Sequence, residues 1–332
     1  MIKAPVQIIL DTDMGNDIDD ALALAMLHAF QSRGECELIG VVVSKDNPYA
    51  PAFVDLFNTF YGYGHIPVGK VRDGVTPLPE KGNFIEEVVG LKGEDGTAMF
   101  STTVPSQSGY PDAVSVLRSR LAAAEDRSVV IVMIGFSTNL AHLFKSGEDE
   151  FSALDGLELF ARKVKHVVMM AADFSESVQA NLSMKNREYN IRCDVASACS
   201  FIGACPRPIY FSGLEIGLQV LYPAASLVHD FNWCAEHPLV HAYGRYLPMP
   251  YDRPTWDLTA VLYAVRPEQG YFGLSRPGIA RIDREGIVRF EERSDGQHFH
   301  LTLDERQRER VCEVQKQLVS QPVRSVLSSA FA

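Results

Sequence analysis

The sequence lacks the cysteine patterns that mark zinc ribbons and disulfide-rich proteins. Its six cysteines are scattered over 332 residues, and no two of them form a C-x-x-C pair. Long apolar runs are also missing. The amino-terminal segment MIKAPVQIIL has one Lys and a run too short for a signal peptide or a transmembrane helix. We therefore expect reduced thiols and a cytoplasmic protein that does not act at a membrane.

An excess of positive charge is absent as well. The formal net charge is −11 at pH 7, which disfavours nucleic acid and anionic membranes as partners because both attract Lys and Arg. The hydrophobic content of 46% is ordinary for a soluble globular protein that can fill a sizeable core. The composition favours a soluble, acidic protein that binds a small molecule.

The sequence alternates short apolar runs with amphipathic segments. The runs predict buried strands at 6–11, 38–44, 128–135, 164–171 and 208–213. The segments between them predict helices at 19–32, 51–62, 111–125, 138–146 and 193–204. Continuous β-branched runs separated by helices are typical of an α/β fold with an open, mostly parallel, Rossmann-like sheet covered by helices on both faces. Such sheets bind ligands beyond the carboxyl ends of their strands.

The last third of the chain has a different pattern. Residues 278–303 alternate apolar and polar side chains across two turn signals, which predicts a short antiparallel meander appended to the sheet. A polar helix is expected at 304–319. Because no repeat, low-complexity linker or domain boundary is visible, we expect residues 1–332 to form a single domain.

The segment LDTDMGNDIDDALAL, which starts at Leu10, concentrates aspartates where the first strand meets the first helix. Helix capping explains about two of them. No Lys or Arg lies between Lys3 and Arg33, so we expect a cation from solution to neutralise the others. Oxygen donors without His or Cys favour Ca²⁺ or Mg²⁺. An EF-hand loop fits poorly, because its sixth and twelfth positions would be Asn16 and Leu22 where Gly and Glu are needed.

Two aspartates are adjacent in this segment, Asp19 and Asp20. Neighbouring helical residues diverge by roughly 100° around the axis, so we expect one of them to hold the metal and the other to face substrate or water. A haloacid-dehalogenase phosphatase also begins with strand-D-x-D. Its later Ser/Thr, Lys and acidic motifs are not found in order in this sequence, but a metal-dependent phosphatase stays an alternative.

Four segments resemble the inosine–uridine nucleoside N-ribohydrolase family in the family's own order. DTDMGNDIDDALAL (11–24) is similar to its D-x-D-P-G-x-D-D-A signature, and GFSTNLAHL (135–143) resembles G-P-L-T-N-L-A. REYNIRCDVASA (187–198) resembles A-E-F-N-I-x-x-D-P-x-A-A, and PTWDLTAVLYAV (254–265) resembles x-H-D-x-x-A-V. The resemblance covers residues 6 to about 270 and implies an open α/β sheet with its site at the strand ends.

The resemblance also implies the activity and the residues that carry it. Family members bind one Ca²⁺ per subunit and hydrolyse the N-glycosidic bond of ribonucleosides, and they are commonly homodimers or homotetramers. By resemblance, Ca²⁺ would be bound by the carboxylates of three aspartates and one main-chain carbonyl: Asp13, Asp20, Asp257 and Thr138. Asp13 would also take a proton from the attacking water. Asp19 would contact that water and the ribose, and Glu188 and Asn190 would bind the ribose.

The chain departs from the family pattern at the metal motif and before its last aspartate. Two extra residues precede the Asp19–Asp20 pair, so Asp17 becomes an alternative metal ligand. Trp256 stands where many relatives carry a His that protonates the departing base. It is expected either to stack on the base or to be a core or lid aromatic.

Further candidates lie in three loops. The segment 241–254 has the composition of a mobile loop, and some of its side chains could close over the site and donate a proton: His241, Tyr243, Arg245 and Tyr246. The loop after the second strand offers Asn47 as a ribose ligand, together with Lys45 and Asp46. Asn181 and Asn186 are candidates for the asparagine that the family has before its E-F-N motif. Glu215 is expected at the edge of the site.

Two further interpretations stay open besides calcium-dependent nucleoside hydrolysis. One is the metal-dependent phosphatase. The other is a calcium-bound ribose or nucleoside binding protein without turnover, which the missing His makes conceivable. The retained aspartates argue against it, because a protein that only binds does not need a set of residues to activate water.

Overall fold

The computed structural model describes residues 4–76, 83–106, 109–183, 185 and 187–323. Asn186 therefore lies outside the described residues. The helices are α1 (Asp19–Ser32), α2 (Ala50–Phe60), α3 (Phe84–Val89), α4 (Ala113–Ala123), α5 (Thr138–Lys145), α6 (Gly156–Lys163), α7 (Glu176–Ala180), α8 (Tyr189–Cys193), α9 (Val195–Ala204), α10 (Leu214–Gln219), α11 (Ala224–His229), α12 (Pro238–Tyr246), α13 (Trp256–Val265) and α14 (Glu305–Val319). In this part of the chain, none is long and apolar enough to cross a membrane.

The strands form one large sheet and a two-stranded ribbon. They are β1 (Val6–Thr12), β2 (Cys36–Lys45), β3 (Val68–Val75), β4 (Val129–Met133), β5 (Val164–Met170), β6 (Ile209–Ser212), β7 (Leu221–Tyr222), β8 (Arg253–Pro254), β9 (Gly273–Leu274), β10 (Gly278–Ile282), β11 (Val288–Glu292) and β12 (His298–Thr302). Among the described residues, the large sheet has the order β11-β10-β12-β6-β5-β4-β1-β2-β3, with β9 paired to β12, and β7 pairs with β8. All pairs from β6 to β3 are parallel.

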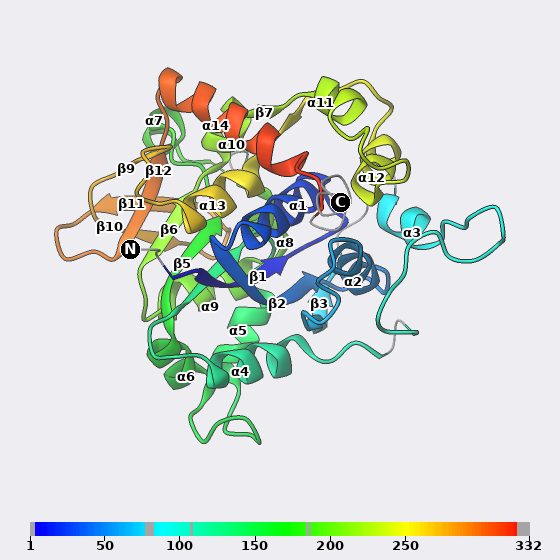
Figure 1. Cartoon of the computed structure of the whole chain (residues 1–332). Coiled ribbons are helices and arrows are strands. Elements are labelled where there is room, and N and C mark those ends of the chain that lie inside the picture. Colours follow the sequence, from blue (N-terminus) through cyan, green and yellow to red (C-terminus); the bar gives the residue numbers. More distant parts are fainter. Residues whose placement is uncertain (1–3, 77–82, 107–108, 184, 186, 324–332) are drawn as a thin grey trace.

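Alternate residues of the central strands supply two separate cores. In β4, Val130 and Val132 belong to the core on one face, whereas Ile131 and Met133 belong to the core on the other. Helices α1, α2, α13 and α14 cover the first face, and α4, α5, α6 and α9 cover the second (Figure 1). Because both faces are buried, the central strands carry continuous apolar runs, as the sequence indicated. The predicted α/β fold is confirmed.

Most predicted elements match the structure, and the differences have local causes. Strand β3 was not predicted, because its sequence VGKVRDGV mixes glycine and charge into a strand at the sheet edge. The predicted helix 193–204 is divided at Asp194, which leaves helical geometry and accepts a hydrogen bond from the backbone of Ser197 as the cap of α9. The expectation of a mobile loop over 241–254 is wrong at its start, because residues up to Tyr246 belong to α12.

The carboxyl-terminal strands are antiparallel, as predicted, but they are not appended in simple succession. Strand β10 lies between β11 and β12 and pairs antiparallel with both. Strand β12 pairs parallel with β6, so these strands continue the main sheet. The alternating sequence pattern indicated strands, but it carries no information on which edge they join. Helix α14 follows and begins at a capping box formed by Asp304 and Gln307.

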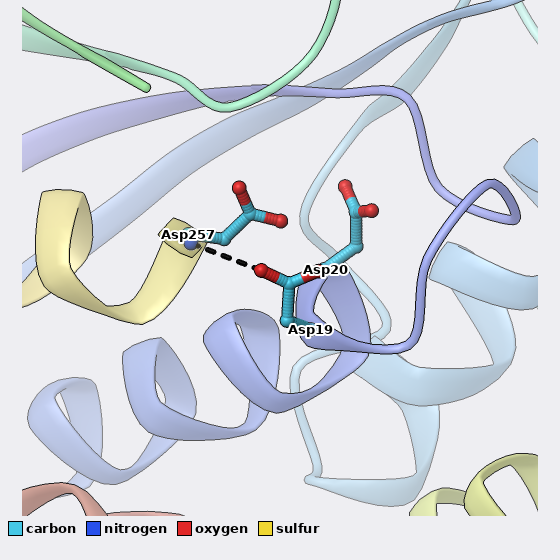
Figure 2. A group of neighbouring side chains, drawn as sticks. All are labelled: Asp19, Asp20 and Asp257. Atoms are coloured by element: carbon cyan, nitrogen blue, oxygen red, sulfur yellow. Dashed lines mark hydrogen bonds between the residues drawn. The ribbon is translucent and has the colours of Figure 1, made fainter. Parts of the chain in front are cut away.

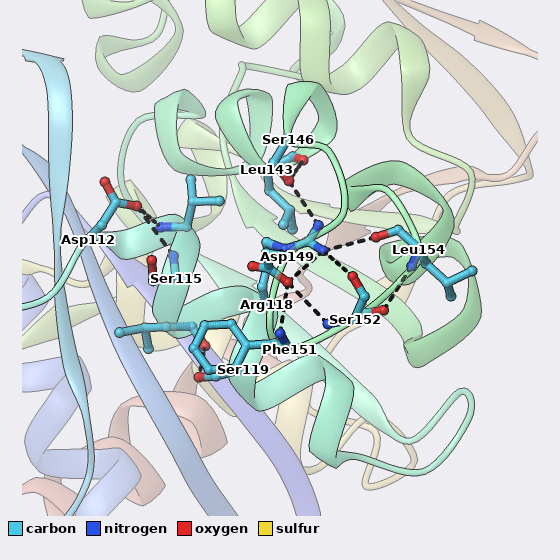
Figure 3. Close-up of polar contacts among 12 residues, drawn as sticks. Asp112, Ser115, Arg118, Ser119, Leu143, Ser146, Asp149, Phe151, Ser152 and Leu154 are labelled. Carbon is cyan, nitrogen blue, oxygen red and sulfur yellow. Dashed lines mark hydrogen bonds and ion pairs between the residues drawn. The ribbon is translucent and has the colours of Figure 1, made fainter.

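A buried arginine on α4 contacts the segment that connects α5 to α6, on the face of the sheet covered by these helices. Arg118 on α4 is 2% exposed and forms two hydrogen bonds with Asp149, of 2.6 and 2.9 Å (Figure 3). The same guanidinium donates to the carbonyls of Ser152 and Leu154 and to the hydroxyl of Ser146. It therefore fixes the connection between α5 and α6, because a buried cation needs its donors satisfied.

Candidate active site

A pocket opens where the carboxyl ends of β1, β4 and β5 meet the first turns of α1, α8 and α13. This is the switch point of the sheet, because the chain leaves β1 towards β2 on one side and returns to β4 on the other. Its cavity of about 190 Å³ exceeds by more than ten times the roughly 10–15 Å³ that one water needs. It is lined by Asp13, Asn16, Asp17, Asp19, Asp20, Ile134, Met170, Glu188, Tyr189, Asn190, Leu214, Tyr246, Arg253, Trp256 and Asp257.

Three buried carboxylates converge at one side of this pocket. Asp19 and Asp20 begin α1, Asp257 lies in the first turn of α13, and one oxygen of each is within 4.8 Å of the others (Figure 2). The backbone N–H of Asp257 donates to Asp19 Oδ2 over 3.1 Å, and the hydroxyl of Thr12 donates to Asp20. Burial, followed by repulsion from neighbouring aspartates, raises the pKa of all three well above the usual value. A bound cation would remove this penalty.

The geometry of this trio places Asp19 and Asp20 together, and the expected division of roles between them stays a prediction. Their side chains do diverge along the helix, yet both contribute an oxygen to the same group. Adjacent Cα atoms are only about 3.8 Å apart, so both carboxylates reach a common point at the start of a helix. Capping does not explain them either, because the N-cap of α1 is Ile18 and no side chain caps the helix.

Asp13 lines the same pocket beside the carboxylate trio. Its carboxylate accepts a hydrogen bond from the side-chain amide of Asn16, and Lys45 Nζ donates to Asn16 Oδ1 over 2.6 Å. Burial raises the pKa of Asp13 to about 6, although the Asn16 hydrogen bond and the charge of Lys45 oppose the rise. Gly135 after β4 permits this packing, since a Cβ at that position would collide with the backbone of Asp13. Asp13 is thus a buried carboxylate held by a short chain of polar contacts.

Glu188 and Asn190 enter the pocket from the start of α8. Glu188 caps that helix by accepting the backbone N–H groups of Asn190 and Ile191, and burial raises its pKa to about 7. The Asn190 amide donates to the carbonyls of Ile134 and Met170 over 3.0 and 3.3 Å. Ile134 follows β4 and Met170 ends β5, so Asn190 links the ends of two strands that border the pocket.

Two basic side chains reach the aspartates, contrary to the expectation from the local sequence. Lys45 comes from the end of β2, and Arg253 comes from β8. Arg253 Nε donates to Asp17 Oδ1 over 2.9 Å, and Nη2 donates to Asp17 Oδ2. The absence of Lys and Arg between residues 3 and 33 therefore did not mean an absence of cations in space. Asp17 is engaged by this ion pair and is not part of the carboxylate trio.

Trp256 lies next to Asp257, where it is held on two sides. Its indole N–H donates to the carbonyl of Leu214 over 3.1 Å, and the Arg253 guanidinium carbon lies 5.1 Å from the ring centroid. A Cβ on Gly217 would collide with Trp256, so the glycine makes room for the indole. Trp256 lines the pocket, with the Arg253 guanidinium over part of its ring. The two expected roles, stacking on the base or serving as a core or lid aromatic, stay predictions.

Several predicted residues do not line the pocket, among them Arg245 and the two side chains named with Asn47, Lys45 and Asp46. Thr138 begins α5, where its hydroxyl donates to Asp194. Asn47 accepts from the backbone of Tyr49 and lines a separate cavity beside Lys70. The others are Asn181, exposed after α7; His241, which bonds Glu236 and Arg245; and Tyr243, which is buried and donates to the carbonyl of Tyr251. The helical geometry of α12 turns His241 and Tyr243 away, and only Tyr246 of the four expected residues reaches the pocket.

Sequence reasoning missed several residues that the structure places in the pocket. Arg253 was passed over although it stands four residues before Asp257, inside a segment already singled out. Asn16 follows β1, and its hydrogen bond to Asp13 has no signal in the sequence. The remaining lining residues are apolar or aromatic side chains that resemble core residues: Ile134, Met170, Tyr189 and Leu214.

Glu215 at the start of α10 lies beside the pocket but does not line it. Its carboxylate accepts the backbone N–H of Phe174 over 3.0 Å, and burial raises its pKa from 4.5 to about 7. The folded protein therefore binds the proton more tightly than the unfolded chain, so the stability contribution of this residue falls as pH rises from 4.5 to 7.

We expect the substitution Glu215→Gln to remove this pH dependence. The amide keeps an acceptor for Phe174 but carries no charge. It should stabilise the protein by about 2 kcal/mol at about pH 8 and by less than about 0.5 kcal/mol at about pH 4.5. Urea denaturation at both pH values measures the difference. The exposed Glu148→Gln is the control, and an equal gain for Glu215→Gln at both pH values would contradict the expectation.

The fold and the site together define an α/β protein with a buried acidic pocket at its strand ends, and comparison with known proteins identifies the group. The family model described as inosine-uridine preferring nucleoside hydrolase matches residues 8–322, so the chain belongs to this family. The protein is accordingly a hydrolase that acts on nucleosides. A comparison with curated proteins found no match.

Solved structures with the same fold are distant in sequence. The purine-preferring ribonucleoside hydrolase from Gardnerella vaginalis is 18% identical, with a TM-score of 0.68 over 95% of this chain and 98% of that one. A plant nucleoside hydrolase is 20% identical, with a TM-score of 0.67 over 96% and 100%. An inosine-uridine preferring nucleoside hydrolase from Bacillus anthracis is 16% identical, with a TM-score of 0.61 over 95% and 99%. At these identities the likeness establishes the fold.

Proposed function

We propose that the protein uses one bound calcium ion to hydrolyse the N-glycosidic bond of ribonucleosides, releasing a free base and ribose. The observation that carries this proposal is the buried trio of Asp19, Asp20 and Asp257, with Asp13 in the same pocket. We further propose nucleoside salvage in the cytoplasm as its setting and a homodimer or homotetramer as its assembly, both from the resemblance to the family.

The donor chemistry of the pocket supports calcium as the metal. Among the described lining residues there is no His or Cys, and the trio offers only carboxylate oxygens. Several carboxylates in one buried group suit Ca²⁺, whereas Mg²⁺ usually keeps most of its waters and needs one or two carboxylates. When bound, the ion would orient ribose hydroxyls and lower the pKa of a water molecule. We propose the trio as its side-chain ligands, with Asp13 as the neighbouring carboxylate.

Asp13 is proposed as the general base. Without a bound ion, burial raises the pKa of Asp13 to about 6, so the carboxylate is ionised at neutral pH and available to accept a proton. The contact with Asn16 fixes one carboxylate oxygen, which leaves the other to accept a proton from the attacking water. Positioning of this kind converts a random encounter into a near-attack geometry.

The remaining polar side chains fit a ribose. We propose that Glu188 and Asn190, which are fixed by their contacts with the start of α8 and the strand ends, bind ribose hydroxyls. Cleavage of an N-glycosidic bond places positive charge on the ribose ring, as in other glycoside hydrolyses. An acidic, buried pocket stabilises that charge more strongly than water does.

Release of reducing sugar tests this function. The panel contains purine and pyrimidine nucleosides and 4-nitrophenyl riboside, each assayed with calcium and with a chelator. We expect release from at least one natural nucleoside, and its loss in chelator. Release that survives complete chelation would contradict the role of calcium. Absence of release from every riboside would contradict the function, and phosphate release from a phosphomonoester would instead support the phosphatase.

A further inference from the structure

An arginine occupies the wall of the pocket next to the residue that replaces the family's histidine. Arg253 belongs to β8, its side chain is 17% exposed, and its guanidinium lies against the faces of Tyr246 and Trp256, 5.1 Å from each ring centroid. Its Nη2 donates to the hydroxyl of Tyr246 over 3.1 Å as well as to Asp17. Such a guanidinium is fixed in orientation by its surroundings before any ligand arrives.

The ion pair that holds Arg253 is made by a residue in the lengthened part of the aspartate motif. Asp17 lies in the stretch Asn16–Asp17–Ile18, which is longer than the family spacing. Its carboxylate accepts hydrogen bonds from Nε and Nη2 of Arg253. Among the described residues, none accepts a hydrogen bond from Nη1 of Arg253. The insertion, the arginine and the replacement of His by Trp256 therefore meet at one point in space.

We propose that Arg253 is the leaving-group residue of this enzyme and selects bases that carry a carbonyl oxygen, with Asp17 as its positioning residue. The proposal rests on the proposed nucleoside hydrolysis and names the feature of the substrate that this pocket recognises. Arginine stays protonated at all relevant pH values, so it stabilises the departing base by hydrogen bonds and not by giving up a proton. A charge-assisted hydrogen bond to a carbonyl oxygen strengthens as that oxygen becomes negative.

The bond changes balance without a protein acid. The C1′–N bond breaks and its electron pair moves onto the base, where a carbonyl oxygen conjugated to the ring shares the negative charge and accepts from Arg253. The oxygen of the attacking water bonds to C1′, and its proton passes to Asp13. The base anion then takes a proton from solvent. A base with an amino group at the same position presents a donor to the guanidinium and gains nothing from it.

Inosine and adenosine provide the sharpest test, because at the 6-position inosine carries a carbonyl and adenosine carries an amino group. We expect the native protein to prefer inosine, and Arg253→Met to lower kcat/KM for inosine by about 100-fold. Adenosine and 4-nitrophenyl riboside, whose phenolate leaves easily, should lose no more than about 10-fold. Asp17→Asn should also lower the ratio of kcat/KM for inosine to kcat/KM for adenosine, because the carboxylate that orients the Arg253 guanidinium is lost.

Matched variants keep the test decisive. Arg245→Met removes an arginine of α12 that pairs with Glu87 and does not line the pocket, and it should leave the ratio unchanged. If Arg253→Met does not fold, Arg253→Lys keeps the charge but loses the fork of donors, and should still lower the ratio. An equal loss on all three substrates, or an unchanged ratio, would overturn the proposal while hydrolysis itself stands. No release from any riboside by the native protein would overturn the proposed function.

Discussion

The substitution Asp13→Asn should lower kcat for the best nucleoside by about 10³-fold. The amide has the size of the carboxylate and can still contact Asn16, but it cannot accept a proton from water. Burial raises the pKa of Asp13 to about 6, which gives the native residue the basicity that asparagine lacks. Because the packing is retained, the loss should fall mainly on kcat and not on KM.

Steady-state kinetics at saturating calcium, combined with thermal melting, measures this effect. Asp46→Asn is the matched control, since Asp46 follows β2 and lines the separate cavity beside Lys70. It should retain the native rate. If Asp13→Asn kept activity near that of the native protein, the assignment of Asp13 as the general base would be wrong. This outcome would not bear on calcium binding by the trio.

Calcium should stabilise the folded protein by about 2.7 kcal/mol at a free concentration 100 times its dissociation constant. For a chain of this size we expect the Tm to rise by about 5 °C. The physical reason is the trio of buried carboxylates, whose charge is costly in the folded state until a cation is bound. Thermal melting in chelator and in calcium measures the shift.

The pH dependence of this shift follows from the raised pKa values of the trio. In chelator, the folded protein binds more protons than the unfolded chain, so its stability falls as pH rises. Calcium competes with these protons, and its stabilising effect should therefore be larger at about pH 8 than at about pH 6. Asp257→Asn should reduce the effect. An unchanged Tm on calcium addition, with the native protein folded, would contradict the proposed site.

Much of the site was accessible from the sequence because several of its acidic residues are close together along the chain. Asp13, Asp19 and Asp20 occur between one strand and one helix, and any parallel sheet delivers such a segment to its carboxyl edge. Glu188, Asn190 and Asp257 were found by resemblance to the family's motifs, and all of them line the pocket. Loop residues were predicted less well. His241 and Tyr243 belong to α12, where helical geometry directs them elsewhere.

By itself, the sequence determined the elements that periodicity controls: the apolar strands, the amphipathic helices and the acidic turn after β1. Only the tertiary structure decided which distant residues meet that turn. Lys45 and Arg253 reach the aspartates from β2 and β8, and Asp19 joins Asp20 and Asp257 in one group. Hydrophobic patterning specifies which face of an element is buried. Contacts between polar side chains depend on how the packed elements are placed relative to one another, which no local pattern records.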